Sequence, residues 1–213
     1  TAYEIYQCDW SSDVCSSDLE FIRVARDARL PLGQMKSAEQ VSTEAYEVER
    51  RDVWTYVAEH PADGSIGNAL AKLSDYGRTD IAVRPAEYDA DRLRRGALVA
   101  FVTDNTVRLR GWPVPYVDRQ HSVHQEAAWV GQDIGATVVP HHEAWRMCPS
   151  GQFLHQRALA TDLRDAADLQ ATAPGATGAV AVWDVLLYMV EVAEFGARMS
   201  TALDVPSISF DVS

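Results

Sequence analysis

Residues 179–203 read AVAVWDVLLYMVEVAEFGARMSTAL, and this stretch decides the fold. Its only charged residues are Asp184, Glu191, Glu194 and Arg198, which fall within about 80° of one another on a wheel of 3.6 residues per turn. The pattern predicts a long core helix that is buried on most of its circumference and shows water a single charged stripe. Glu194 and Arg198, spaced i, i+4, are expected to pair. Four charges make the stretch a costly membrane span, so we expect this helix to lie on a sheet.

Outward from this helix, hydrophobic periodicity and Gly/Pro breaks predict the remaining elements. Helices are expected at residues 44–60, 65–76, 89–102 and, as a short one, 141–147. Extended segments are expected at residues 81–83 (ending before Pro85), 107–112, 121–134, 152–161 and 207–212. A hairpin joining 98–102 to 107–112 is the alternative to the helix at 89–102. The predicted fold class is α+β: N-terminal helices, then a largely antiparallel sheet packed against one long C-terminal helix.

The first nineteen residues look foreign to this fold. Residues 8–19, CDWSSDVCSSDL, match the translation of a sequencing adapter, and such segments are set aside before fold reasoning. We therefore expect an adapter-derived tail at 1–19, a connector at 20–43 and a single α+β domain at 44–213, truncated at both ends. Cys148 is then the only native cysteine, which supports no disulfide framework and fits a reducing, cytoplasmic setting.

The composition is acidic and suits a packed core. The formal net charge is −12, of which four units lie in the tail, and hydrophobic residues make up 47% of the chain. An acidic balance argues against a nonspecific nucleic-acid surface, because phosphate neutralisation needs clustered Lys and Arg. The best basic cluster, Arg92, Arg94 and Arg95, has Asp89 and Asp91 beside it and is expected to be a solvated helix face.

Histidines gather between His121 and His155, with acidic residues among them. Imidazole and carboxylate groups are the ligands of catalytic zinc and iron sites, so one hypothesis is a metal-dependent hydrolase. The candidate ligands are His124, His141, His142, Glu143 and His155. Their spacing is poor for this purpose, and no H-E-x-x-H pattern occurs. The alternative is a set of surface and loop histidines with structural hydrogen bonds, and we expect no cofactor.

Other possible catalytic groups have ordinary structural explanations. Ser150 lacks the preceding glycine of a nucleophile elbow and is expected to form a turn. Cys148 would need a base such as His141 or His142 folded back onto it. Glu191 and Glu194 could form an acid–base pair, but a solvated stripe is the favoured interpretation.

Three segments together resemble a known family region. They are Arg110-Gly-Trp-Pro-Val-Pro115, then His142-Glu-Ala-Trp-Arg146 with Ser150-Gly-Gln-Phe153, and then Val190-Glu-Val-Ala-Glu-Phe195 with Ala197-Arg198. This resembles the region C-terminal to the AlbA-type (Schlafen-like) DNA- or ATP-binding domain of bacterial proteins, over roughly residues 81–210.

The resemblance implies a non-enzymatic accessory or sensing module of a nucleic-acid- or nucleotide-binding regulator. Its partner would be an upstream AlbA-like domain of the same protein, with no direct nucleic-acid or membrane contact from this fragment. Trp112, Trp145 and Arg146 would stabilise the core or, alternatively, line a ligand cleft. No catalytic residue is carried over, and a homo-oligomer is a further possibility.

Overall fold

The computed structural model describes residues 36–60, 73, 77–118, 123–136, 141–159 and 180–213. The chain divides into two compact units, Thr1–Val41 and Ser42–Ser213. The expected adapter tail, most of the connector and most of the second helix at 65–76 lie outside the described residues. Leu73 belongs to that predicted helix; it is helical and completely buried.

The helix α2 spans Ala38–Glu59 and begins earlier than the expected residue 44. Its start is a reciprocal cap. The backbone N–H of Gln40 donates to the Ser37 hydroxyl at 3.1 Å, and the Ser37 backbone N–H donates to Oε1 of Gln40 at 2.9 Å. This S-x-x-Q arrangement satisfies two backbone donors that a helix start leaves open. Tyr46 and Val53 are the buried residues of α2.

Six strands form one sheet with the order β2-β3-β4-β5-β1-β6. The strands are β1 (Arg78–Pro85), β2 (His124–Gln125), β3 (Val130–Ala136), β4 (His141–Met147), β5 (Phe153–Ala158) and β6 (Ile208–Val212). All neighbouring strands are antiparallel. With the long helix α6, Val182–Leu203, this sheet confirms the predicted α+β class. Contrary to expectation, Pro85 is part of β1, where it pairs with Ile208 of the edge strand β6.

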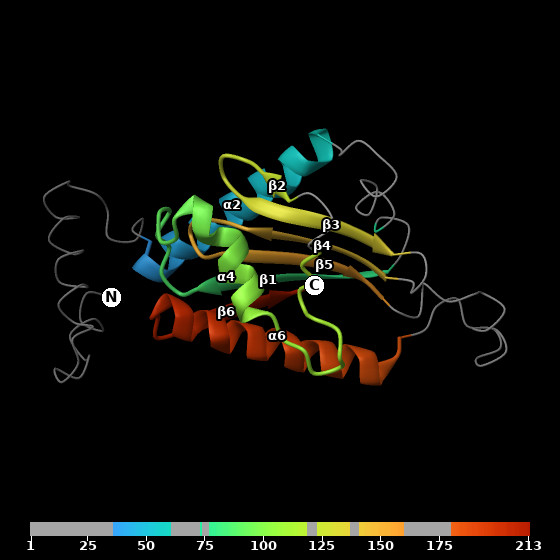
Figure 1. Cartoon of the computed structure of the whole chain (residues 1–213). Coiled ribbons are helices and arrows are strands. Elements are labelled where there is room, and N and C mark those ends of the chain that lie inside the picture. The colour runs from blue at the N-terminus through green and yellow to red at the C-terminus, as the bar shows by residue number, and fades with distance from the viewer. Residues whose placement is uncertain (1–35, 61–72, 74–76, 119–122, 137–140, 160–179) are drawn as a thin grey trace, which may run out of the picture. The chain divides into compact units, whose positions relative to one another are not determined.

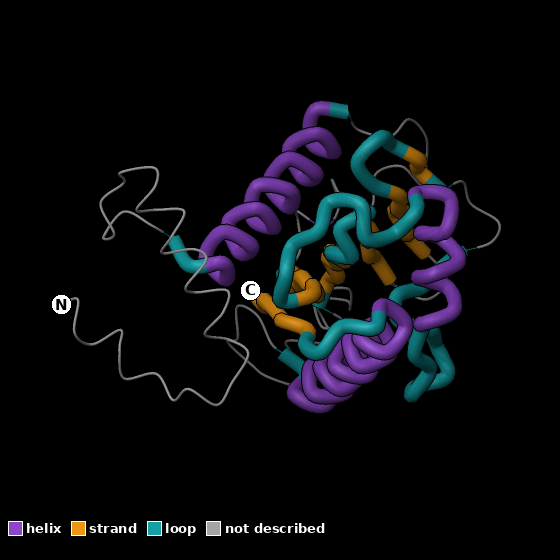
Figure 2. The backbone as a smooth tube through the Cα atoms, turned by 90° about the vertical axis from the view of Figure 1, so that its left-hand side faces the viewer, coloured by secondary structure: helices purple, strands orange, loops and turns teal. Residues whose placement is uncertain are grey.

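The two faces of the sheet carry different helices, because alternate residues of a strand point to opposite faces. Val83 and Phe153 belong to the large core cluster that also contains Phe195 of α6. Ala82 and Leu154, their neighbours along the strands, pack with Val53 of α2. Figures 1 and 2 show α6 and α2 on different sides of the strands.

The segment that was expected as a helix at 89–102 or as a hairpin differs from both interpretations. A short 3₁₀ helix, Arg95–Ala97, leads into α4, Leu98–Asn105, whose residues Leu98 and Val102 join the α6-side core. Residues 107–112 form no strand; Val107 makes a single bridge with Val114. The prolines that flank Val114 leave few backbone donors for a ladder.

The predicted helix at 141–147 is wrong, because these residues form β4 in the middle of the sheet. The segment lacks the β-branched residues that favour a strand locally. Pairing with β3 on one side and β5 on the other decides its conformation. As a result, His141, Glu143 and Trp145 share one face, and His142, Ala144 and Arg146 share the other.

The predicted orientation of the long helix is wrong for its first half. Asp184 and Glu191, expected to face water, are buried, whereas Trp183, Leu186 and Val190 are exposed. The pairing expected between Glu194 and Arg198 is confirmed, with Nε 2.8 Å from Oε1. No helix in the described part of the chain is long and apolar enough to cross a membrane.

Candidate functional site

Two central strands build a polar group beneath α6. The strand β4 places His141 and Glu143 on the α6 side, and β5 adds His155 opposite Trp145 and Arg157 opposite Glu143. Tyr188 of α6 closes over them. We call His141, Glu143, His155 and Tyr188 the histidine–glutamate cluster.

The carboxylate of Glu143 is the centre of this cluster and is completely buried. Its Oε2 lies 2.8 Å from Nε2 of His141, and its Oε1 accepts the backbone N–H of Tyr116 at 2.7 Å. Nε2 of His155 lies 3.4 Å from Oε2 but makes no hydrogen bond with any described residue. The contact with His155 is therefore electrostatic.

The cluster keeps Glu143 ionised. Burial alone would raise the pKa of Glu143, because a buried carboxylate loses its hydration. The charge and hydrogen bond of His141 act against burial, with His155 adding to them, so the pKa of Glu143 lies well below its ordinary value. Glu143 is accordingly a buried anion at neutral pH.

A hydrogen bond links the cluster to α6. The Tyr188 hydroxyl lies 2.6 Å from Nδ1 of His155. Burial is the main cause that raises the pKa of Tyr188, so the phenol keeps its proton. A polar path therefore runs from Tyr188 through His155 and Glu143 to His141.

The cluster approaches the surface at His141 and Trp112. The side chain of His141 is 14% exposed and Trp112 is 40% exposed. The Trp112 ring stacks on Tyr116 with centroids 5.2 Å apart and meets the His141 ring edge-on at 6.1 Å. An exposed aromatic ring can stack on a planar polar ligand. The imidazole beside it, which is hydrogen-bonded to a carboxylate, can accept a proton.

A second polar group lies beside Tyr188 on the buried side of α6. The Arg110 guanidinium lies 2.5 Å from both the Asp184 and the Glu191 carboxylates. Arg157 lies 3.2 Å from Asp184 and stacks over the Tyr188 ring at 4.8 Å. Two guanidinium groups therefore neutralise two buried carboxylates. This pairing is needed because an unpaired charge is costly to bury.

The three residues proposed to line a ligand cleft do not share one. Trp145 and Arg146 are adjacent in β4, so their side chains point to opposite faces, and both are buried. The Trp145 indole N–H donates to the Tyr116 carbonyl at 3.0 Å on the α6 side. Of the three, Trp112 has the exposed side chain.

Arg146 is built into the opposite face of the sheet. Its guanidinium lies 2.6 Å from the Asp133 carboxylate and stacks over Trp129 at 4.7 Å and Trp54 at 5.6 Å. A buried Arg that is paired with a carboxylate and covered by two indole rings is a packing element.

The sheet also separates the five residues considered as metal ligands. His141, Glu143 and His155 lie together, whereas His142 lies on the opposite face of β4 and His124 lies in β2. The Nε2 atoms of His141 and His155 both face the Glu143 carboxylate. Within the described ranges, no group of three or more His, Cys, Asp or Glu side chains is placed to hold a metal ion.

Ser150 and Cys148 lie at the β4–β5 turn, against α2. The Ser150 hydroxyl donates to Oε2 of Glu49 at 2.6 Å, and the Gln152 amide donates to the same atom at 3.1 Å. Burial raises the pKa of Cys148 well above its ordinary value, and the nearby charge of Glu49 raises it further. A thiol that stays protonated is a poor nucleophile.

Sequence reasoning missed Arg110, Arg157 and Tyr188 as members of this site. A signal was present, since two carboxylates on an otherwise apolar helix need cationic partners if that side is buried. Glu191 pairs with Arg110 in the interior, whereas Glu194 pairs with Arg198 at the surface, so the two glutamates do not form an acid–base pair.

No protein-family model, no curated protein and no solved structure matches this chain.

Proposed function

We propose that this chain is a non-enzymatic accessory or sensing module of a cytoplasmic bacterial regulator. Its nucleic-acid- or nucleotide-binding part would be an upstream AlbA-like domain of the same protein. In this proposal the fragment itself contacts neither nucleic acid nor membrane, in keeping with its net charge of −12.

The pairing of Arg110 with Glu191 is the observation that carries the proposal. Arg110 belongs to the first segment of the family resemblance and Glu191 to the third, and their side chains lie 2.5 Å apart. Phe153 of the second segment packs on Phe195 of the third with ring centroids 4.6 Å apart. The residues that carry the resemblance therefore contact one another in the interior. Their role in the fold is enough to explain them, and no catalytic role is required.

The state of the buried ionisable groups also supports a non-enzymatic role. The raised pKa values of Cys148 and Tyr188 keep both groups protonated. Nucleophilic catalysis needs the opposite arrangement, in which a base or a lowered pKa activates the attacking group.

The metal-dependent hydrolase is the second candidate, because His141, Glu143 and His155 do come together. It has weaker support, since no group of three or more His, Cys, Asp or Glu side chains in the described ranges is placed to hold a metal ion. Nε2 of His141 lies against the Glu143 carboxylate, and Nδ1 of His155 lies 2.6 Å from the Tyr188 hydroxyl.

Metal analysis of the purified chain distinguishes the two candidates. We expect substoichiometric zinc and iron after purification in chelator-free buffer, and an unchanged metal content in a His141→Ala variant. Stoichiometric zinc or iron that His141→Ala removes would overturn the non-enzymatic proposal in favour of the hydrolase.

Resequencing the source locus across the junction before Glu20 tests the regulatory part of the proposal. An in-frame AlbA-like domain upstream would support an accessory module. A start codon close to Glu20 would contradict it.

A further inference from the structure

The outward face of α6 is apolar along its first half. Val182, Trp183, Leu186, Leu187 and Val190 are between 39% and 68% exposed. The side chains that normally face water on such a helix, Asp184 and Glu191, are instead buried with Arg110. A contiguous apolar face of this kind on a helix surface marks an interaction site.

The second half of the same face is lined by small residues. Trp183, Val190 and Ala197 are spaced by seven residues, so they stay within about 40° of one line along the helix. Ala193 and Ala197 are exposed on the far side of Val190 from Trp183. The exposed face of the helix therefore carries large apolar side chains before Val190 and small side chains after it.

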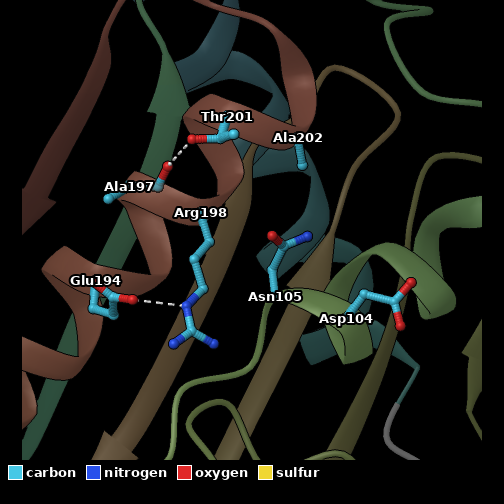
Figure 3. Close-up of a pocket in the computed structure, with 7 residues that line it drawn as sticks. All are labelled: Asp104, Asn105, Glu194, Ala197, Arg198, Thr201 and Ala202. Carbon is cyan, nitrogen blue, oxygen red and sulfur yellow. Dashed lines mark hydrogen bonds and ion pairs between the residues drawn. The ribbon is translucent and has the colours of Figure 1, made fainter.

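A groove of about 440 Å³ lies over this small-residue half, between α6 and the end of α4. Ala197, Thr201 and Ala202 line it on the α6 side, with Glu194 and Asp104 among its other lining residues. Figure 3 shows Arg198 extending from α6 into this region beside Glu194. Arg198 is fixed there, since its Nη1 also donates to the Thr106 carbonyl at 2.7 Å.

We propose that α6 is the interface of a symmetric dimer, in which Trp183 of each copy enters the groove of the other. An antiparallel α6–α6 pair with its two-fold axis beside Val190 places Trp183 of one copy opposite Ala197 of the other. The same operation repeats the contact in reverse, as an isologous interface requires.

The groove has the chemistry that an indole ring needs. It is an open depression on the surface, so a side chain from a second copy can enter it. Small apolar groups from Ala197 and Ala202 can contact the ring, and the Arg198 guanidinium can stack on its face. The Glu194 and Asp104 carboxylates supply acceptors for the indole N–H.

Charge favours a second copy on this face. The chain as a whole carries −12, so two copies repel each other over most of their surfaces. Along α6, Asp184 and Glu191 are neutralised internally, and Glu194 is paired with Arg198. Two acidic chains can therefore approach along α6 with little repulsion. This inference goes beyond the proposed function, since a monomer would overturn the dimer and leave the proposed regulatory role untouched.

The test is the mass of the full chain by sedimentation and light scattering, from about 1 to about 200 µM. A reductant must be present, because Cys8 and Cys15 could otherwise cross-link copies. We expect a dimer whose dissociation constant rises at least about tenfold in Trp183→Ala, since interface tryptophans are frequent hot spots. Ala197→Arg, which fills the groove from an exposed position, should have the same effect. Trp112→Ala is the matched control, because Trp112 is a comparably exposed tryptophan outside α6.

Mixing the two variants tests the symmetry. Trp183→Ala keeps an open groove and Ala197→Arg keeps its Trp183, so the mixture should form a heterodimer that is tighter than the dimer of either variant alone. A monomeric wild-type chain at every concentration would overturn the proposal. So would a dimer that survives both α6 variants, a loss as large in Trp112→Ala, or a mixture that stays monomeric.

Discussion

Glu143 and His141 lie two residues apart on one strand, and Oε2 of Glu143 is 2.8 Å from Nε2 of His141. The carboxylate is completely buried, and the same side chain accepts the Tyr116 backbone N–H at 2.7 Å. This pair joins the centre of the sheet to the loop that carries Trp112. Through Glu143, the partly exposed His141 is also connected to His155, which in turn contacts the Tyr188 hydroxyl.

Replacing Glu143 with Gln should destabilise the fold by about 3 kcal/mol at pH 7, because breaking a buried charge pair leaves its partners unsatisfied. The folded-state pKa of Glu143 is lowered, so its contribution is complete above the ordinary carboxyl value of 4.5 and is lost as the pH falls below it. The difference between wild type and variant in urea unfolding should therefore stay constant from pH 7 to about pH 5 and shrink as the pH is lowered to about pH 3. Glu194→Gln is the control, since its exposed pair with Arg198 is worth under about 1 kcal/mol.

Replacing Arg110 with Met should cost about 3–5 kcal/mol, because Glu191 is left charged and buried, while Asp184 retains Arg157. The double variant Arg110→Met with Glu191→Gln should recover most of that loss, since it removes both charges. Urea unfolding of the two single variants and the double variant measures the coupling. Additive losses would mean that Arg110 acts through packing and that the ion pair has no special part.

The long helix was predictable because its own composition determines it, but its orientation was not. A helical wheel places Asp184 and Glu191 on the water side unless the cation that neutralises them is known. That cation, Arg110, lies in the loop between α4 and β2, and nothing local connects it with α6. The sequence therefore predicts a helix of the right extent and places Glu194 and Arg198 correctly, but it assigns Asp184 and Glu191 to the wrong face.

The candidate site was hidden for a related reason. Residues 141–147 lack local strand propensity, so their conformation depends on β3 and β5. On a helix, His141 and Glu143 would point in different directions; on a strand they share a face. Recognising the histidine–glutamate cluster thus required the sheet pairing, which single-sequence periodicity does not supply.

Glu49 should behave in the opposite way to Glu143. Burial raises the pKa of Glu49, and hydrogen bonds from Ser150 and Gln152 only partly oppose it. A raised carboxyl pKa means that stability is lost as the pH rises from the ordinary value of 4.5 through the folded-state value. Glu49→Gln should therefore gain stability relative to wild type between pH 4.5 and pH 8. Thermal unfolding across that range checks the sign, and a Glu49→Gln variant that loses stability relative to wild type as the pH rises would contradict it.

Two glycines with close neighbours should differ sharply when changed to Ala. A Cβ on Gly131 would meet the backbone oxygen of Trp145 and Cδ of the buried Arg146. Neither can move, because Arg146 is held by Asp133 in the middle of the sheet. We expect Gly131→Ala to cost about 3 kcal/mol or more through overpacking.

Gly196→Ala is the comparison, since its new Cβ would meet the ring of Phe210. That ring is 43% exposed on the edge strand β6 and can turn aside, and Ala is favoured over Gly inside a helix by about 1 kcal/mol. The melting temperature of Gly196→Ala should consequently stay close to that of wild type, while that of Gly131→Ala falls by several degrees. Equal losses in the two variants would show that Phe210 is fixed on α6, and the β6 edge would then be as rigid as the centre of the sheet.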